Sequence, residues 1–434
     1  MVNLSAELQK LTRLCEDSVK GNSKSRSRAD AEFIYGNVNI ALSELFKKIA
    51  PFGRGAVFFA QKESERFARE IPREQSTGVK IINVVCENES CYDSETADEY
   101  LNLPEDVRFA VASDLSALNV AKYFSQKRDV PLIFVPSSLK IFFSLYGKSV
   151  FNRNGSEIRI PFDRKIYVVA DDTFISAEDA DELFAHIMGS YCDVIDYRVN
   201  CAVNGIMPDH GSFNLFKNSV LQALKICDST SAFRKKALFI CGFSIELASK
   251  LSGDKIYDSS APKTAVRLSG LKSYDPFRAF DCAVKTLAVY DEGFKAGPIN
   301  RFPDYLYRRD AVCHLTGEDH ARVSEWLTAQ LSTCVERERE ISALRNNLKG
   351  EVSFFNDNMT RIINCYRSLS GERRFSTDFH TILSVLLSGD CREINGMSLM
   401  REWGVTEDAF SLVASCDEKL KSFNCNRENE DIKR

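Results

Sequence analysis

The sequence predicts an α/β N-terminal, Rossmann-like domain followed by an all-helical C-terminal domain. Short apolar runs alternate with helical segments as far as residue 172, strand-like runs nearly disappear after Ser176, and apolar residues then recur at helical spacing. Parallel strands need a crossover connection, so the alternation predicts a parallel sheet covered by helices on both faces. The predicted bounds are 1–172 for the α/β domain, 173–416 for the helical domain and 417–434 for a polar tail.

The strands of the α/β domain are predicted at short apolar runs. In chain order these runs are Gly55–Ala60, Val79–Val85, Val107–Ala112 and Val130–Val135. Helices are predicted after the first and third of these runs, at Gln61–Glu70 and Ser116–Gln126. The last two runs of the domain, Ile158–Asp163 and Lys165–Ala170, are expected to form a hairpin.

Helical spacing in the C-terminal domain is clearest in two rows of apolar residues. The rows are Val323, Trp326, Leu327, Leu331 and Val335, then Ile341, Leu344, Leu348 and Val352. Both rows are expected to face a core, with a coiled-coil interface as the alternative. The charged run Glu336–Glu340 between them is expected to be a solvated face with short-range ion pairs.

Composition limits the function classes. Lys and Arg number 57 against 61 Asp and Glu, whereas a dedicated nucleic-acid binder needs excess cationic charge. The longest apolar run, Ala237–Phe243, is far shorter than the ~20 residues that cross a bilayer. The fourteen cysteines contain no Cys-x-x-Cys pair, and the first residues contain no signal-peptide core. We therefore expect a cytoplasmic protein with reduced thiols, no nucleic-acid partner and no membrane span.

The general catalytic motifs are missing from the sequence. It contains no Gly-x-x-x-x-Gly-Lys-Ser/Thr, no His-Glu-x-x-His and no Gly-x-Gly-x-x-Gly. The five histidines show no i, i+3 or i, i+4 pair that would place two metal ligands on one helix face.

Three segments, taken in order, resemble one enzyme superfamily. Ala110–Tyr123 with Val130–Ser138 is similar to a strand, a glycine-rich phosphate loop, a helix ending Ala-Lys-Tyr, and a strand ending Val-Pro-Thr. Tyr167–Asp172, followed by helical Asp181–Asp193, resembles the segment that carries an aspartate metal ligand. Ser259–Arg267 resembles a Ser-Gly-Ala-Glu-His-x-x-Ser-His stretch.

The superfamily is that of the iron-containing alcohol dehydrogenases, glycerol-1-phosphate dehydrogenases and dehydroquinate synthases. The resemblance covers roughly residues 35 to 295 and implies a dehydroquinate synthase-like fold. It also implies a homo-oligomer, a nicotinamide cofactor and a catalytic metal. Lys122, in the Ala-Lys-Tyr position, is expected to be a helix-terminal residue rather than a catalytic one.

The cofactor loop implied by the resemblance is altered. Three consecutive small residues let backbone amides approach a pyrophosphate at a helix N-terminus. The matching positions here are Ser113, Asp114 and Leu115, with Ser137 after the next strand. Asp114 places a carboxylate where phosphate charge should lie. An aspartate that contacts substrate in the glycerol-1-phosphate branch is matched at or near Phe142, which removes a polar partner of a polyol phosphate.

The metal site implied by the resemblance is altered too. Members of the superfamily hold zinc or iron with one Asp and two His, and the matching positions are Asp193, Lys263 and Asp275. A protonated lysine cannot ligate a divalent cation, so our hypothesis is that Lys263 fills the cation's place. The alternative is that the three residues are unrelated surface charges. Arg267, at the last His of the third segment, is either an anion ligand or a surface arginine.

These changes favour a diverged, non-catalytic protein that acts through binding or oligomerisation. The alternative is an NAD(P)-dependent oxidoreductase acting on a small polyol or polyol phosphate with a rewired site. An enzyme of another class on the same scaffold also stays open. Zinc or iron is not expected, and a bound NAD(P) and a small polyol-type ligand belong to the oxidoreductase alternative.

Overall fold

The computed structural model describes residues 10–15, 17, 31–49, 53–60, 78–87, 93–153, 156–226, 231–268, 274–298, 305–370 and 394–404. The chain forms two compact units. Unit 1 is Met1–Leu183 with Asp228–Asp254, and unit 2 is Phe184–Cys227 with Lys255–Arg434. Among the described helices, none is both long enough and apolar enough to cross a membrane.

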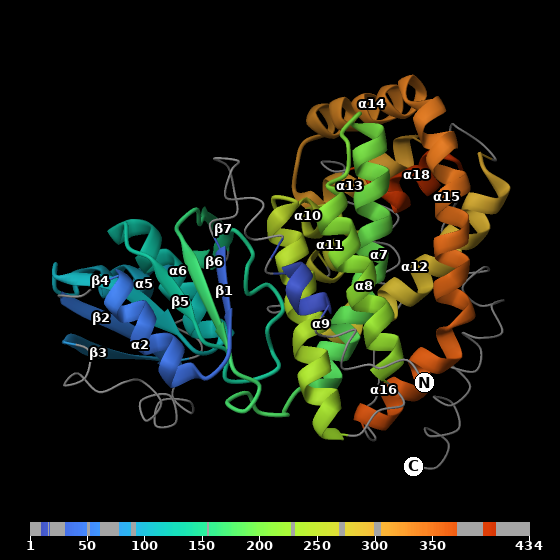
Figure 1. Ribbon diagram of the computed structural model, residues 1–434. Helices are drawn as coiled ribbons and strands as arrows, with labels where there is room; N and C mark the ends of the chain where they lie inside the picture. The colour runs from blue at the N-terminus through green and yellow to red at the C-terminus, as the bar shows by residue number, and fades with distance from the viewer. Residues whose placement is uncertain are drawn as a thin grey trace, which may run out of the picture. The chain divides into compact units, whose positions relative to one another are not determined.

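Unit 1 is built on a six-stranded parallel sheet (Figure 1). Its strands are β1 (Ala31–Tyr35), β2 (Gly53–Ala60), β3 (Val79–Cys86), β4 (Val107–Ala112), β5 (Leu132–Phe134) and β8 (Ile166–Ala170). Their order across the sheet is β1-β8-β5-β4-β2-β3, and every neighbouring pair is parallel. This sheet confirms the predicted Rossmann-like architecture.

The predicted hairpin of Ile158–Asp163 with Lys165–Ala170 is wrong. β7 (Ser156–Pro161) instead pairs antiparallel with β6 (Lys148–Arg153), while β8 lies in the parallel sheet between β1 and β5. All five residues of β8 are buried, as is typical of a strand covered on both faces. Neither β1 nor β6 was predicted, because each is a short segment with charged or polar residues inside it.

Helices cover both faces of this sheet, as the alternation predicts. They include α2 (Val38–Ile49), α5 (Ser94–Glu99), the single-turn η2 (Tyr100–Asn102) and α6 (Leu115–Arg128). Val57 and Phe59 of β2 pack in one core with α2, whereas the ring of Phe58 lies 5.3 Å from that of Phe124 of α6. Because neighbouring side chains of a strand point to opposite faces, α2 and α6 lie on opposite faces of the sheet. The predicted helix Gln61–Glu70 lies outside the described residues.

Unit 1 also contains α9 (Ser231–Leu251), a helix from later in the chain. The ring of Phe243 stacks on that of Phe33 of β1 at 4.2 Å, and Ser244 hydrogen-bonds Cys15 at 3.1 Å. The sheet unit is therefore completed by residues far away in the sequence.

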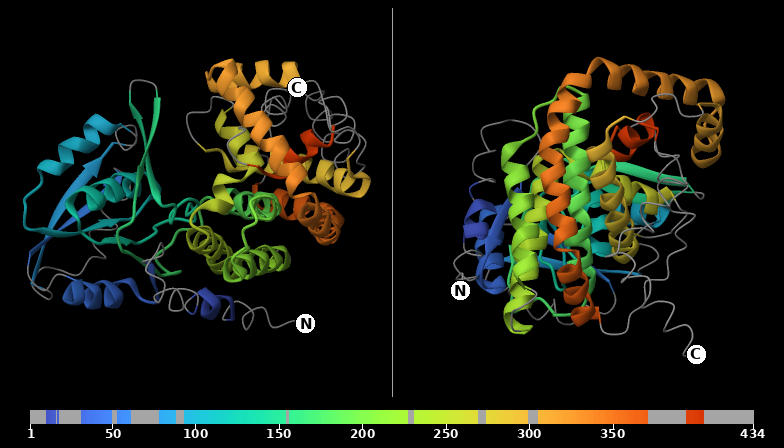
Figure 2. Two further views of the ribbon diagram at one scale, coloured as in Figure 1. Left: turned by 90° about the horizontal axis from the view of Figure 1, so that it is seen from above. Right: turned by 90° about the vertical axis from the view of Figure 1, so that its right-hand side faces the viewer.

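Every described element that lies wholly in unit 2 is a helix, in agreement with the predicted all-helical domain. The helices are α8 (His210–Ile226), α10 (Lys255–Asp258), α11 (Ala261–Leu268), α12 (Pro276–Ala296), α13 (Tyr305–Thr316), α14 (His320–Glu336), α15 (Glu338–Asp357), α16 (Met359–Ser370), α18 (Gly396–Glu402) and most of α7 (Ala180–Val203). α15 runs alongside α7 (Figure 2), where the rings of Tyr191 and Phe355 stack at 4.9 Å. The predicted polar tail lies outside the described residues.

The two apolar rows pack largely as predicted. Val323 and Leu327 of α14 are buried, as are Ile341, Leu348 and Val352 of α15. Val335 is an exception, since it is 50% exposed in the last turn of α14. The charged run lies at the junction of the two helices, where they change direction (Figure 1).

Candidate functional site

In unit 1, the predicted cofactor positions lie at the carboxyl ends of β4 and β5. Ser113 follows β4 directly, and Ser137 lies three residues beyond β5. The amide and the hydroxyl of Ser137 both donate to the Ser113 carbonyl, at 2.9 and 3.0 Å. Both serines are buried, so the structure brings them together as a tie between two strand ends.

Asp114 caps the N-terminus of α6. Its backbone is extended, and its carboxylate accepts the Ala117 amide at 2.8 Å. Leu115 is the first helical residue. A helix N-terminus attracts anions through its free amides. Here the chain's own carboxylate occupies that position, so a phosphate group would meet a negative charge.

Phe142, matched to a substrate-binding aspartate, is 9% exposed and lies in the segment between β5 and β6. Its neighbour Phe143 has a φ of 61°, in the left-handed region that non-glycine residues rarely adopt. Phe142 belongs to unit 1 and Arg267 to unit 2. Arg267 lies in α11, and its side chain is outside the described residues.

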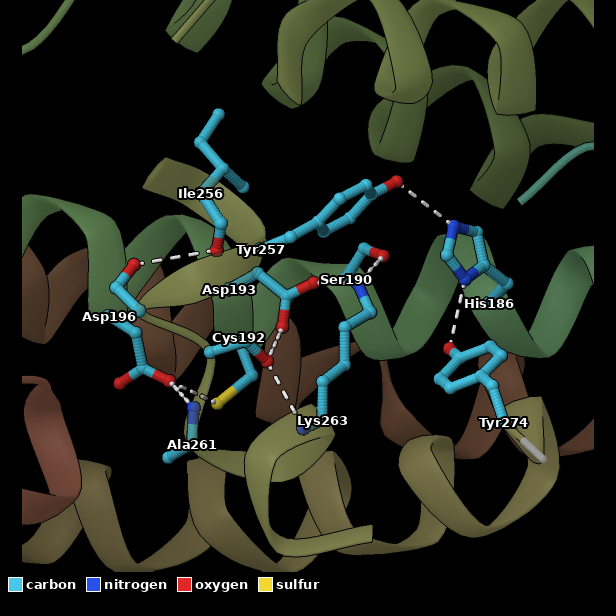
Figure 3. Close-up of polar contacts among 12 residues, drawn as sticks. His186, Ser190, Cys192, Asp193, Asp196, Ile256, Tyr257, Ala261, Lys263 and Tyr274 are labelled. Atoms are coloured by element: carbon cyan, nitrogen blue, oxygen red, sulfur yellow. Dashed lines mark hydrogen bonds and ion pairs between the residues drawn. The ribbon is translucent and has the colours of Figure 1, made fainter. Parts of the chain in front are cut away.

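The structure brings Lys263 and Asp193 together inside unit 2 (Figure 3). Asp193 lies in the middle of α7, and Lys263 lies in the first turn of α11. The Lys263 ammonium is in direct contact with the Asp193 carboxylate, and the two side chains are only 7% and 1% exposed. Ser260 fixes the start of α11 and with it the position of Lys263, because its hydroxyl accepts the Lys263 amide at 3.2 Å and so caps the helix.

Further polar groups surround this ion pair. The ammonium donates to the Ser190 hydroxyl at 3.0 Å and lies 4.1 Å from the centre of the Tyr257 ring. The Ser260 hydroxyl donates to the other oxygen of Asp193. A buried ion pair is tolerated when such additional hydrogen bonds satisfy both charges, and an aromatic face stabilises the cation further.

His186 joins the same cluster, although it was not among the predicted site residues. Its ring nitrogens hydrogen-bond the hydroxyls of Tyr274, at 2.9 Å, and Tyr257, at 3.3 Å. Burial and the nearby Lys263 charge hold the pKa of His186 well below its usual range, so the imidazole is neutral. Its spacing from Asp193 is the sequence signal that could have identified His186. It precedes Asp193 by seven residues, which places both on one face of α7.

Asp275 has a different role from Asp193 and Lys263. Its carboxylate accepts the amides of Phe277 and Arg278, at 2.9 and 3.2 Å, and so caps α12. Its ion-pair partner is the Arg278 side chain at 3.4 Å. The residue before it, Tyr274, reaches the cluster through His186. Of the three predicted metal positions, the structure therefore brings two into contact.

Asp196, one turn beyond Asp193 on α7, is a second buried carboxyl. It accepts the Tyr290 hydroxyl at 2.6 Å, the Ala261 amide at 2.7 Å and the Gly396 amide at 2.9 Å. Burial raises its pKa to about 7. This residue ties α7 to α11, α12 and the start of α18, and no cation is paired with it among these contacts.

The residues of the cluster do not fit a divalent cation. One Asp193 oxygen contacts an ammonium and the other accepts a hydroxyl, so neither is directed at an empty coordination position. An ammonium has no lone pair to donate and repels a metal ion. Within the described part of the chain, no group of three His, Cys, Asp or Glu side chains could hold a metal.

Comparisons with known proteins give a consistent fold. No protein-family model and no curated protein sequence matches the chain. The iron-containing alcohol dehydrogenase of Thermococcus thioreducens superposes with a TM-score of 0.51 at 11% identity, over 88% of this chain and 98% of that one. The maleylacetate reductase of Agrobacterium tumefaciens superposes with a TM-score of 0.52 at 8% identity, over 87% and 96%. The chain therefore has the fold of the iron-containing alcohol dehydrogenase and dehydroquinate synthase-like superfamily.

Proposed function

We propose that this chain is a diverged protein of the glycerol-1-phosphate dehydrogenase type that binds no divalent metal and acts by binding rather than by catalysis. The observation that carries the proposal is the buried contact between Lys263 and Asp193. A catalytic metal of this superfamily needs an open coordination position to polarise a hydroxyl or carbonyl. The Lys263 ammonium instead engages a carboxylate, a hydroxyl and an aromatic face.

The cofactor loop supports the same proposal from the other unit. The Asp114 carboxylate accepts an amide of the α6 N-terminus, and a pyrophosphate would have to displace it. Phe142 adds an aromatic wall where a polyol hydroxyl would need a polar partner. Loss of the metal site, the phosphate site and a hydroxyl partner together favours a ligand-binding or assembly role over turnover.

The experiment combines metal analysis, calorimetry and a turnover assay on the intact chain. The protein is dialysed against Zn²⁺ or Fe²⁺ and its metal content is measured. It is then titrated with oxidised and reduced NAD and NADP and assayed with glycerol and glycerol 1-phosphate. We expect less than 0.1 metal equivalent, on the order of background, and no turnover. Stoichiometric metal with metal-dependent turnover would overturn the proposal.

A rewired oxidoreductase is the second candidate function, and one observation favours it. The partly exposed Tyr274 is hydrogen-bonded to buried, neutral His186, so two groups able to pass a proton lie beside the Lys263 charge. Nicotinamide nucleotide binding tighter than about 100 μM, equivalent to more than ~5 kcal/mol, would favour this candidate. Metal-independent turnover of a polyol or polyol phosphate, lost in His186→Phe, would establish it.

We also propose a homo-oligomer in the cytoplasm, as the resemblance implies. Light scattering coupled to size-exclusion chromatography tests the first point: a mass of 49.0 kDa at micromolar concentration would contradict it. Fractionation of the cells that express the protein tests the second.

A further inference from the structure

A buried lysine in unit 1 lies beneath a strained turn. Lys122 of α6 is 3% exposed, and its amine donates to the carbonyl of Tyr146 at 2.8 Å and to that of Phe143 at 3.4 Å. Both carbonyls belong to the 143–147 turn, Phe143–Gly147. The turn begins at the residue with a φ of 61°, a conformation that persists only where its surroundings enforce it.

Residues that follow α9 and β7 hold Gly147, the last residue of this turn. The Gly147 amide donates to the Asp254 carboxylate at 3.0 Å, and a Cβ at Gly147 would lie 2.7 Å from that carboxylate. The Gly147 carbonyl accepts the Phe162 amide at 2.8 Å. The turn is therefore held at Phe143 and Tyr146 by the Lys122 amine, and at Gly147 by residues that follow α9 and β7.

The charged groups that face Lys122 come from the α9 region. Lys250 opposes its charge, while Glu246 and Asp254 favour it, and all three are buried. Lys148, just after the turn, contacts the Tyr146 side chain. Burial is the largest influence, followed by Lys250, and together they lower the pKa of Lys122 to about 7. Above neutral pH the closed turn therefore covers an uncharged amine.

We propose that the 143–147 turn is a proton-controlled lid, which opens when the Lys122 amine takes up a proton and moves into water. The lid directly follows Phe142, so opening changes the surroundings of that residue as well. The inference rests on contacts within unit 1 and is independent of the proposed function.

The direction of the pH dependence follows from the linkage between lid opening and protonation of Lys122. An amine exposed by opening regains a pKa of about 10.4, so opening takes up one proton between neutral pH and about pH 10. The closed lid is therefore stabilised as the pH rises through this window and destabilised as it falls. The opening constant should rise by up to about tenfold for each pH unit lost, or about 50-fold from pH 9 to pH 7, and then change by no more than about twofold.

Hydrogen exchange of the Tyr146 and Gly147 amides measures this opening constant in the full-length protein. After correction for the intrinsic exchange rate, their protection should fall about 50-fold from pH 9 to pH 7 and by no more than about twofold below pH 7. Amides of α2 that exchange by global unfolding carry the same linked proton, because unfolding also exposes Lys122, so the lid is identified by Tyr146 and Gly147 exchanging faster than these amides at every pH. A flat wild-type profile at Tyr146 and Gly147 would overturn the proposal.

Two variants assign the effect to Lys122. Lys122→Met removes the titrating amine, so lid protection should lose its pH dependence. Lys127→Met, an exposed position on the same helix, should keep the wild-type profile. An unchanged slope in Lys122→Met would contradict the assignment. If that variant does not fold, an NMR titration of the wild-type Lys122 amine decides the question, because a midpoint near 10 would exclude the mechanism.

Discussion

Asp114 in unit 1 and Lys263 in unit 2 each place a charged side chain where, by the sequence resemblance, a ligand of the same sign of charge would bind. Asp114 is negative, like a phosphate, and Lys263 is positive, like a metal ion. At the N-terminus of α6, a carboxylate lies at the position that the sequence resemblance assigns to a cofactor phosphate. In the helical unit, an ammonium contacts the carboxylate matched to a metal ligand. By the sequence resemblance, each side chain supplies the sign of charge that a bound phosphate or metal ion would bring.

The two replacements differ in how deeply they are built into the fold. Asp114 makes a local cap to a residue three positions away and is partly exposed. Lys263 is buried and joins helices that are 70 residues apart in the sequence. A local cap can be altered at small cost, whereas a buried charge cannot be removed without leaving its partner unsatisfied. Substitution of Asp114 should therefore restore phosphate binding at little cost in stability, whereas substitution of Lys263 should destabilise the fold.

The largest expected effect is at Lys263. Lys263→Met leaves the Asp193 carboxylate buried without its cation and should lower the free energy of unfolding by about 3–5 kcal/mol. Adding Asp193→Asn should recover at least half of this loss, as measured by urea denaturation. Lys285→Met removes a different buried ammonium, paired with Asp281 at 3.1 Å, and should show no such recovery with Asp193→Asn. Additive losses at Lys263 and Asp193 would show that the pair is not coupled.

The next effect concerns the neighbouring carboxyl on the same helix. Burial raises the pKa of Asp196 to about 7, so the folded state binds a proton that the unfolded state releases between about pH 4 and pH 7. This contribution to stability is present at low pH and is lost as the pH rises to 7. The wild type should lose at most about 1.4 kcal/mol per pH unit from this group, and Asp196→Asn should remove that slope.

The pH dependence is measured by denaturant unfolding at pH 5, 6 and 7. Asp319→Asn, at the exposed cap of α14, is the control and should retain the wild-type slope. An identical slope in Asp196→Asn would place the titrating group elsewhere.

A smaller effect is expected at the phosphate position. Asp114→Ala removes an N-cap and should lower stability by about 0.5–2 kcal/mol. The same change should tighten binding of NADH about two- to fivefold, because a charge near a helix end is worth roughly 0.3–1 kcal/mol. Asp319→Ala removes a cap of the same 2.8 Å geometry from α14 and should affect stability alone. If calorimetry detects no gain in NADH affinity for Asp114→Ala, removal of this carboxylate does not restore phosphate binding.

The smallest effect is expected at the edge of the buried cluster. Tyr274→Phe removes the hydroxyl that hydrogen-bonds His186 and should lower the free energy of unfolding by about 0.5–1.5 kcal/mol. Thermal or urea unfolding measures the change, with Tyr146→Phe in unit 1 as a control outside the cluster. A loss as large as that of Lys263→Met would show that His186 and Tyr274 belong to the energetic centre of the site.

Part of the site could be predicted from the order of residue types along the sequence. Asp193, Lys263 and the altered loop at Ser113–Leu115 were selected from the resemblance alone. His186 was missed because its partners, Tyr257 and Tyr274, carry no metal-ligand signal. Asp275 and Tyr274 are adjacent, and only the start of α12 decides which of them faces the cluster.

The sequence by itself determined the fold class, because the period of apolar residues changes from strand-like to helical near residue 172. It also determined the identity of the charges at Asp114 and Lys263. Tertiary structure decided how those charges are satisfied, which strand pairs with β8, and that α9 completes the sheet unit. The physical reason is that burial and pairing depend on contacts between distant segments, whereas periodicity is a local property of the chain.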